Sequence, residues 1–174
     1  MTVIRAMTTG GLEMVLQWRN HPDVRRYMYT QHEISLDEYR RWFESRQCNA
    51  ARHLLIFEQL GVPLGFVSIT EGTPGRIADW GGYLAPEAPR GTERSLGQAA
   101  LKFAFVSLRP HKVCGQALGF NERSIRFHHA LGLSKKVSCA ISILTAKIIN
   151  PSFISACCAK SGKPSNQRHD YEQP

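Results

Sequence analysis

Residues 86–97, PEAPRGTERSLG, form a turn-rich corner between an apolar strand-like run and a helix-like run. The first amide groups of a helix have no partner inside the helix, so a strand-to-helix corner of this kind can hold an anion. Backbone amides around Arg90 to Ser95 suit a pyrophosphate, and Arg90 and Arg94 add positive charge. A plain polar loop capped by Thr92 or Ser95 explains the same residues equally well.

The apolar pattern predicts the element order β-α-α-β-β-β-α-β-α. Thr9 can cap the first helix, and Ser35 with Glu38 has the spacing of a capping box for the second. Three consecutive strands, expected to form a meander, are followed by a β-loop-α-β-α unit. This order predicts a mixed sheet in an α/β (α+β) fold. The expected strands are 2–7, 53–60, 64–70, 76–85 and 112–118. The expected later helices are 95–107, burying Leu96, Ala99, Ala100, Phe103 and Val106, and 121–132, closed by Gly132.

Composition limits the classes of protein that remain. With 174 residues and 43% apolar composition, the chain can form one domain with a real core. No apolar run reaches the roughly 18 residues of a membrane span, and the N-terminus lacks a signal-peptide pattern, so we expect a cytoplasmic protein without a membrane partner. Five cysteines without paired spacing fit free thiols, and the adjacent Cys157 and Cys158 lack a zinc spacing, so no metal is expected.

The net charge of +8 is unevenly distributed. Residues 134–174 contain six lysines and arginines against two acidic residues, so half of the excess charge lies in that segment. The remainder is a mildly basic domain, as expected of an enzyme with phosphorylated ligands, and we do not expect nucleic-acid binding.

Two parts of the chain resemble known families. The segments YLAPEAPRGTERSLGQAALKFAF and LRPHKVCGQALGFNERSIRFHHALGL are similar to the Gcn5-related N-acetyltransferase (GNAT) superfamily. The segments LQWRNHPDVRRYMYTQHEISLDEYRRWFES, HLLIFEQLGVPLGFVSIT and ADWGGYLAP resemble the N-acetyltransferases of pseudaminic-acid biosynthesis. That family acetylates the 4-amino group of a UDP-linked 4-amino-4,6-dideoxy-N-acetyl-altrosamine, a step toward the sugar placed on flagellin. The resemblance covers residues 3–133, and it implies a GNAT domain over 1–133.

The resemblance implies that the anion at the corner is the pyrophosphate of acetyl-coenzyme A. The pantetheine arm would run beside Trp80–Ala85, where two strands of the sheet splay apart. Glu93 stands where the family usually has a second glycine, so we expect it either to point to solvent or to weaken coenzyme binding. The implied coenzyme-binding residues are Leu84, Ala85, Arg90, Gly91, Thr92, Arg94, Ser95, Asn121 and Ser124.

The implied chemistry is direct attack of a neutral amine on the thioester. A backbone amide at Gly82 or Tyr83 would hold the developing oxyanion. His128 stands where many members have a tyrosine that protonates the leaving thiolate, and its ordinary pKa range suits an acid. The alternative is a helix histidine that merely packs beside Phe127.

The acceptor is expected to be a UDP-amino-sugar. Arginines could meet its diphosphate and aromatic rings could stack on uracil or sugar, although a solvated face is the alternative for each residue. His53 and Asp79 are candidates for a base or for sugar contacts. The clustered candidates after the first helix are Arg19, Asn20, Arg25, Tyr27 and Tyr29. A homodimer is a further expectation.

Residues 134–174 do not resemble the family. A one-base shift of the reading frame turns Ser134 to Pro151 into a sequence that begins Gln-Glu-Gly and resembles the family's usual ending, so we hypothesise a frameshift. The usual C-terminal strands would then be missing or replaced, with the sheet ending at 112–118 and its far edge unpaired. The segment ISILTAKII is apolar and β-branched enough to be drawn into the gap, and 160–174 is expected to be disordered.

Three other functions stay open. Related enzymes acetylate protein N-termini or other small amines. The chain could instead be an inactive product that still binds the coenzyme, or a basic interaction module.

Overall fold

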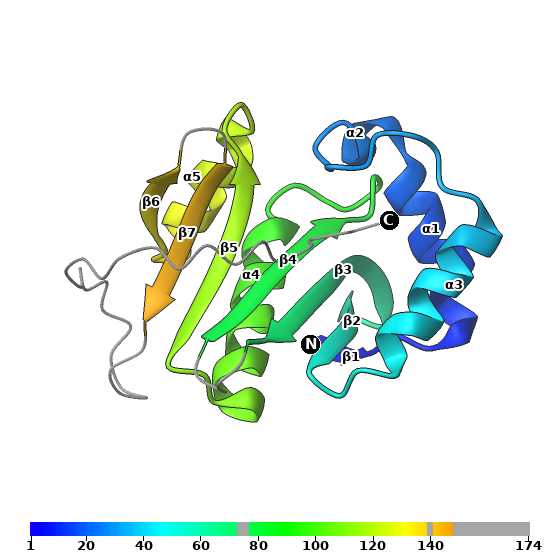
Figure 1. Cartoon of the computed structure of the whole chain (residues 1–174), viewed down its shortest axis with the longest axis horizontal. Coiled ribbons are helices and arrows are strands. Elements are labelled where there is room, and N and C mark those ends of the chain that lie inside the picture. Colours follow the sequence, from blue (N-terminus) through cyan, green and yellow to red (C-terminus); the bar gives the residue numbers. More distant parts are fainter. Residues whose placement is uncertain (73–76, 139–140, 148–174) are drawn as a thin grey trace.

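The computed structural model describes residues 1–72, 77–138 and 141–147, which contain a seven-stranded mixed sheet in the order β1-β2-β3-β4-β5-β7-β6 (Figure 1). Only β4 and β5 pair in parallel, and the other neighbours are antiparallel. The predicted α/β class with a mixed sheet is therefore confirmed. The strands are β1 Thr2–Ala6, β2 Arg52–Gln59, β3 Val62–Glu71, β4 Ile77–Leu84, β5 Lys112–Leu118, β6 Ser134–Ser138 and β7 Ile141–Lys147.

Helices cover both faces of the sheet. In Figure 1, α4 and α5 lie behind the strands, and α1, α2 and α3 group beside β1 to β3. No helix among the described residues is long and apolar enough to cross a membrane. The helices are η1 Thr9–Gly11 (3-10), α1 Leu12–Asn20, α2 Pro22–Arg25, α3 Leu36–Gln47, α4 Thr92–Phe103, η2 Ala104–Leu108 (a π-helix) and α5 Glu122–Ala130.

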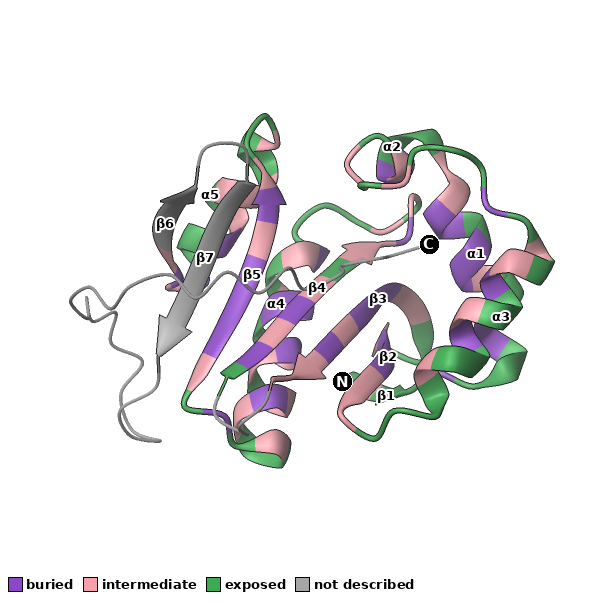
Figure 2. Cartoon of the chain, in the orientation of Figure 1, coloured by how far each residue is buried: buried purple, intermediate pink, exposed green. Residues whose placement is uncertain are grey.

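Two apolar cores lie on the two faces because side chains alternate along each strand. Leu55 and Phe57 of β2 pack with α4 and α5, whereas Leu54 and Ile56 pack with α1 and α3. Figure 2 shows the same alternation as buried bands along β3 and β4. We call the face with α4 and α5 the coenzyme face and the face with α1 and α3 the acceptor face, after the two ligands expected from the sequence.

The helix ends differ in places from the predictions. The Ser35 Oγ accepts a hydrogen bond from the Glu38 amide at 3.2 Å, as predicted, but Thr9 does not cap α1, which starts after Gly11 without a side-chain cap. The fourth helix begins at Thr92 rather than Ser95, because Gly91 takes a left-handed conformation (φ 88°) and serves as its N-cap.

The second half of the α4 segment also departs from expectation. Leu96 and Ala100 are buried as predicted, but Val106 is 63% exposed. The chain changes to a π-helix at Ala104, which shifts the period of the buried face, so Ala104 takes the core position instead.

The parallel pair β4–β5 separates part-way along its length. Pairing runs from Ile77 opposite Lys112 to Trp80 opposite Gly115, and both strands then continue without pairing to each other. The predicted splay next to Trp80–Ala85 is therefore present, and the two strands diverge visibly in Figure 1.

The sheet does not end at β5, so the expectation of an unpaired far edge was wrong. Residues Ile141–Lys147 pair along all of β5, and β6 pairs with β7 beyond them. The apolar segment that begins at Ile141 is thus drawn into the gap, as its β-branched composition favours. The predicted disorder of 160–174 lies outside the described residues.

Candidate active site

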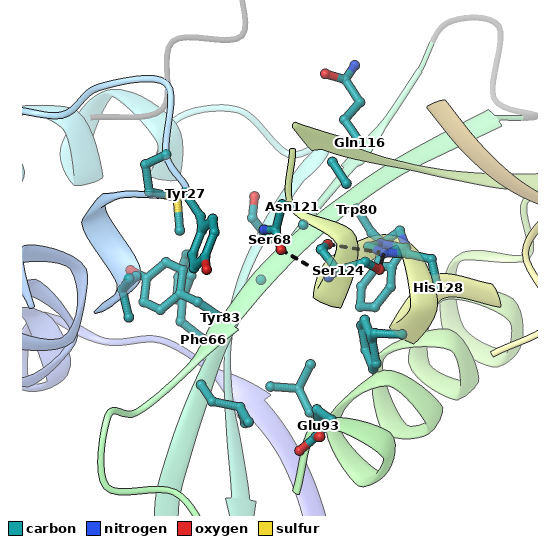
Figure 3. A pocket seen from close by; sticks show the side chains of 18 of the residues that line it. Tyr27, Phe66, Ser68, Trp80, Tyr83, Glu93, Gln116, Asn121, Ser124 and His128 are labelled. Atoms are coloured by element: carbon teal, nitrogen blue, oxygen red, sulfur yellow. Dashed lines mark hydrogen bonds between the residues drawn. The ribbon is translucent and has the colours of Figure 1, made fainter. Parts of the chain in front are cut away.

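A pocket of about 1200 Å³ occupies the splay (Figure 3). Its lining includes Phe66 from the acceptor-face core and Leu96 from the coenzyme-face core. Since these side chains lie on opposite faces of the sheet, the pocket passes between β4 and β5 where they are unpaired. A thioester entering from one face and an amine entering from the other could meet inside it. We call it the splay pocket.

The anion corner opens onto one end of the splay pocket. Arg90, Gly91 and Arg94 line it, as do Leu84 and Ala85. A Cβ atom on Gly91 would meet nothing within 4 Å, so the Gly91 backbone faces open space.

Thr92 and Ser95 lie on the other side of the corner. Thr92 is buried, and both residues line a smaller hollow of about 510 Å³ rather than the splay pocket. Neither side chain caps α4, and any contact of theirs with an anion in the splay pocket would come from their backbone amides.

Glu93 turns back onto the corner. The Gly91 amide donates a hydrogen bond to Glu93 Oε2 at 3.1 Å, and Glu93 Oε1 lies 3.8 Å from the Arg123 guanidinium. The carboxylate was expected to point to solvent or to weaken coenzyme binding; its side chain is 37% exposed, and one of its oxygens also occupies a loop amide. The other half of that expectation, weakened coenzyme binding, stays a prediction.

The start of α5 forms a second polar edge of the pocket. Asn121 Oδ1 accepts from the Ser124 amide at 3.0 Å and so caps the helix, and both residues line the splay pocket. Four residues later on the same helix face, His128 also lines it.

His128 is buried between the rings of Trp80 and Phe127. Its Nδ1 lies 2.7 Å from the Ser124 carbonyl oxygen, which can only accept, so Nδ1 carries the proton and Nε2 of the neutral ring has a free lone pair. Burial lowers the pKa of His128, because the charged imidazolium loses solvation. The ring is thus packed beside Phe127, as one alternative expected, and also faces the pocket.

The amide of Gly82 is better placed for an oxyanion than that of Tyr83. The Ala85 amide donates to the Leu64 carbonyl of β3 at 2.9 Å. Since amides alternate in direction along a regular strand, the Gly82 amide points away from β3 and into the splay, whereas the Tyr83 amide points toward β3. Tyr83 contributes its ring to the acceptor-face core, where burial raises the pKa of the hydroxyl well above its ordinary value.

Arg19 is the most buried charge of the acceptor side, with 2% exposure. Its Nη2 donates to the Thr30 carbonyl at 2.9 Å, and its Nη1 is buried without a hydrogen-bond partner. Burial lowers the pKa of the guanidinium. Asp79 lies opposite Cys114 in the paired part of the strands and also lines the splay pocket.

The segment after α2 reaches across the pocket. The Tyr29 hydroxyl donates to Gln116 Oε1 of β5 at 3.1 Å, and the Tyr27 ring stacks on Phe120 with centroids 6.3 Å apart. Both tyrosines line the splay pocket, and Figure 3 shows the Tyr27 ring at its acceptor end.

Three predicted acceptor residues are not brought to the pocket. Asn20 is bonded to the backbone of Ile34 through both side-chain atoms, at 2.8 and 2.9 Å. Arg25 pairs with Glu33. His53 lies on the coenzyme-face side of β2, where Nε2 is 2.8 Å from Glu71 and the ring meets Phe103.

The structure adds residues that the sequence reasoning missed. Ser68 and Thr70 alternate with buried Val67 and Ile69 on β3, which is the signal that could have placed them on the pocket side. The arginines come from separate elements and gave no local signal. The added polar lining residues include Asp23, Arg26, Arg46, Arg52, Ser68, Thr70, Gln116, Arg123 and Arg126. Within the described ranges, three or more His, Cys, Asp or Glu side chains do not gather as a metal site.

Comparisons with known proteins agree with this geometry. A family profile described as an acetyltransferase (GNAT) domain matches residues 2–134. The acetyltransferase PseH of Campylobacter jejuni subsp. jejuni is 26% identical over 125 residues, which cover 70% of this chain and 76% of PseH.

Solved structures share the fold. The spermidine N-acetyltransferase of Vibrio cholerae, solved in complex with CoA and spermine, superposes with a TM-score of 0.77 at 18% identity, covering 83% of this chain and 94% of that one. The N-acetyltransferase PseH of Campylobacter jejuni superposes with a TM-score of 0.68 at 13% identity, covering 84% and 97%.

Proposed function

The chain belongs to the GNAT acetyltransferases, which use acetyl-coenzyme A, and we propose that its acceptor is an amino sugar carried by a nucleoside diphosphate. The likeness to PseH supports this choice. In the enzyme family that the sequence resembles, the acceptor is the 4-amino group of the UDP-linked 4-amino-4,6-dideoxy-N-acetyl-altrosamine. The product of that reaction leads to the pseudaminic acid placed on flagellin. We place the reaction in the cytoplasm, and a homodimer stays a prediction.

The proposal of a nucleoside-diphosphate acceptor rests on the charge of the acceptor side. Four arginines and two carboxylates line this side of the splay pocket, so it is net basic among the described residues. A polyamine such as spermine would be repelled there, whereas a diphosphate would be attracted. The charged side chains are Arg19, Arg26, Arg46, Arg52, Asp23 and Asp79.

Arg19 is the strongest single attractor. A buried guanidinium with an unpartnered Nη1 carries an unmet desolvation cost, which an anionic acceptor oxygen would offset. Tyr27 lines the splay pocket and stacks on Phe120, so its ring offers an aromatic face on which uracil could stack.

The coenzyme would bind at the corner and along the open edge of β4. Arg90, Arg94 and the Gly91 backbone would hold the pyrophosphate, once Glu93 has released the Gly91 amide. The capped start of α5 at Asn121 and Ser124, which follows β5, would contribute polar contacts from the other side of the splay.

The chemistry then needs three groups of this chain. Asp79 orients the sugar amine, and the Gly82 amide stabilises the oxyanion when the amine nitrogen bonds to the thioester carbon. His128 Nε2 accepts the proton of that nitrogen, and the imidazolium returns it to the thiolate after the carbon–sulfur bond breaks. In this scheme His128 first acts as a base toward the amine. Its expected role as an acid, which protonates the thiolate, follows as the second step of the same proton transfer.

The test is acetyl transfer to a panel of acceptors, followed by mass spectrometry. Purified protein and acetyl-coenzyme A are incubated with UDP-amino-sugars, N-terminal peptides and spermidine. We expect mass gain on a UDP-4-amino-sugar alone. Acetylated peptide or spermidine with untouched sugar would replace the proposed acceptor. Coenzyme binding without any transfer would point to an inactive product, and salt-sensitive DNA binding to a basic interaction module.

Residues 134–174 lie outside the proposed acetyltransferase domain. We propose that the acetyltransferase domain is 1–133 and that the frame changes at codons 132–135. The tail's own residues form β6 and β7 at the place where the sheet would otherwise end. Resequencing the gene at these codons tests the hypothesis, and an uninterrupted frame shared by relatives would remove it.

A further inference from the structure

Two arginines on the coenzyme side of the splay pocket have no part in the function proposed above. Arg123 and Arg126 lie one turn apart on α5, and both line the pocket. Arg90 and Arg94 line it from the corner and from the first turn of α4, which lies on the same side of the sheet as α5 (Figure 1). Among the described lining residues of the corner, α4 and α5, Glu93 is the one carboxylate that faces these four arginines. This side therefore has more positive charge than the two negative charges of a pyrophosphate diester would neutralise.

The Glu93 carboxylate connects Arg123 to the anion corner. One of its oxygens accepts from the Gly91 amide at 3.1 Å, and the other lies 3.8 Å from the Arg123 guanidinium. The guanidinium is thus separated by a single carboxylate from the amide that would hold the pyrophosphate. The Arg123 side chain is 76% exposed, so it can turn toward a ligand without disturbing the core.

Coenzyme A carries a third phosphate, on the 3′-oxygen of its ribose. This phosphate is one ribose away from the pyrophosphate, and as a monoester it carries about 1.5 to 2 negative charges near pH 7. A guanidinium can donate to two phosphate oxygens at once, which makes arginine a suitable partner. The place of Arg123 beside the corner and the excess charge on α5 both suit this group.

We propose that Arg123, assisted by Arg126, binds the 3′-phosphate of the coenzyme and makes the protein select coenzyme A over its 3′-dephospho form. This role rests on the coenzyme site proposed above. When the pyrophosphate displaces Glu93, Arg123 loses its ion-pair partner, and the 3′-phosphate takes that place. Arg126 keeps a partner of its own, because its Nη1 lies 3.6 Å from Glu122 Oε2, so it contributes less.

Isothermal titration with coenzyme A and with 3′-dephospho-coenzyme A tests this role without an acceptor or turnover. Both ligands contain the pyrophosphate and the pantetheine arm, so the ratio of their dissociation constants isolates the 3′-phosphate. We expect wild type to bind coenzyme A about tenfold more tightly, and Arg123→Gln to reduce this preference to about threefold or less. Arg123→Lys, which keeps the charge, should retain most of the preference. High salt should reduce the wild-type preference, because it screens exposed charges.

Two other arginines serve as controls. Arg90→Gln should weaken the binding of both ligands by the same factor, because Arg90 is assigned to the pyrophosphate. Arg41→Gln, at an exposed position of α3 away from the pocket, should change neither dissociation constant.

Two results would overturn the role of Arg123. Equal binding of the two ligands by wild type would show that the 3′-phosphate is not recognised. An Arg123→Gln protein with the full wild-type preference would show that Arg123 serves the pyrophosphate or only pairs with Glu93. Failure of wild type to bind either ligand would overturn the proposed coenzyme site, and this role with it.

Discussion

Glu93 Oε2 accepts a hydrogen bond from the Gly91 amide at 3.1 Å, so a carboxylate of the protein itself occupies an amide that a phosphate would use. The contact is reinforced by Arg123 at 3.8 Å. A pyrophosphate that binds at this corner must displace the Glu93 side chain or bind close to its negative charge. If the coenzyme binds at this corner, as we propose, Glu93 is expected to oppose its binding.

Replacing Glu93 by Gly is expected to strengthen coenzyme binding about tenfold, or about 1.4 kcal/mol, because it removes one negative charge and frees one amide. Glu93→Gln separates the two effects, since it keeps an acceptor oxygen without charge. Isothermal titration with coenzyme A gives the dissociation constants. Unchanged or weaker binding in both variants would contradict the role assigned to Glu93.

Replacing Gly91 by Val is expected to raise the KM for acetyl-coenzyme A at least tenfold more than the KM for the acceptor. A side chain would keep phosphate away from the backbone, and φ of 88° strains any residue with a Cβ by roughly 1–2 kcal/mol. Gly61→Val is the control, because Gly61 has φ of 79° and equally open surroundings in the β2–β3 turn. Both variants should lose similar stability. Equal effects on both KM values at Gly91 would remove the corner from the coenzyme site.

The buried His128 predicts a pH dependence of stability. Its pKa is lowered in the folded state, so below the unfolded value of about 6.5 the unfolded chain binds more protons than the folded one. Its contribution is therefore full above pH 6.5 and is lost as the pH falls toward the lowered folded pKa. The melting temperature should drop between pH 7.5 and 5.5 by more in wild type than in His128→Gln.

His128→Gln is also expected to lower kcat by about a hundredfold with little change in KM for acetyl-coenzyme A, as removal of a proton-transfer group does. When kcat is plotted against pH, the fall on the acid side should occur below pH 6.5 in the wild type and should be absent from His128→Gln. His129→Gln, at an exposed neighbouring position, is the control. A His128→Gln enzyme with full kcat would show that the ring only packs.

Reversing the charge of the acceptor side should change acceptor preference. Arg26→Glu is expected to lower kcat/KM for the UDP-amino-sugar at least tenfold, while transfer to spermidine rises from its low level. Arg26 is half exposed or more, so the change should not unfold the protein. Arg41→Glu, on the exposed side of α3 and away from the pocket, should alter neither rate.

Restoring the reading frame after codon 132 is expected to raise the melting temperature by at least about 5 °C, to improve solubility and to increase transfer. Family-type strands would then replace the tail beside β5. Thermal unfolding and acetyl transfer of the two chains, measured together, check this. Equal melting temperatures and equal rates would make the present tail a working part of the fold.

Local signals in the sequence determined the elements. The Ser35–Glu38 cap, the alternation of β2 and β3, and the corner before α4 depend on hydrogen bonds and side-chain directions within a few residues, so they could be read directly. The family resemblance added the splay between the fourth and fifth strands. Neither could place the π-helix at Ala104, because a change of helical period depends on what the helix packs against.

Tertiary structure decided the content of the site. Asn20 and His53 have residue types that suit a binding site, yet long-range contacts with Ile34 and Glu71 hold them elsewhere. Arg46 and Arg52 join Arg19 only because α3 and β2 pack against α1. Trp80 and His128 are 48 positions apart in sequence, and their rings can pack together because Gly115, on a third element, has no side chain to clash with them. Sequence fixes which groups are available over a few residues, whereas burial and pairing between distant segments decide which of them remain free to react.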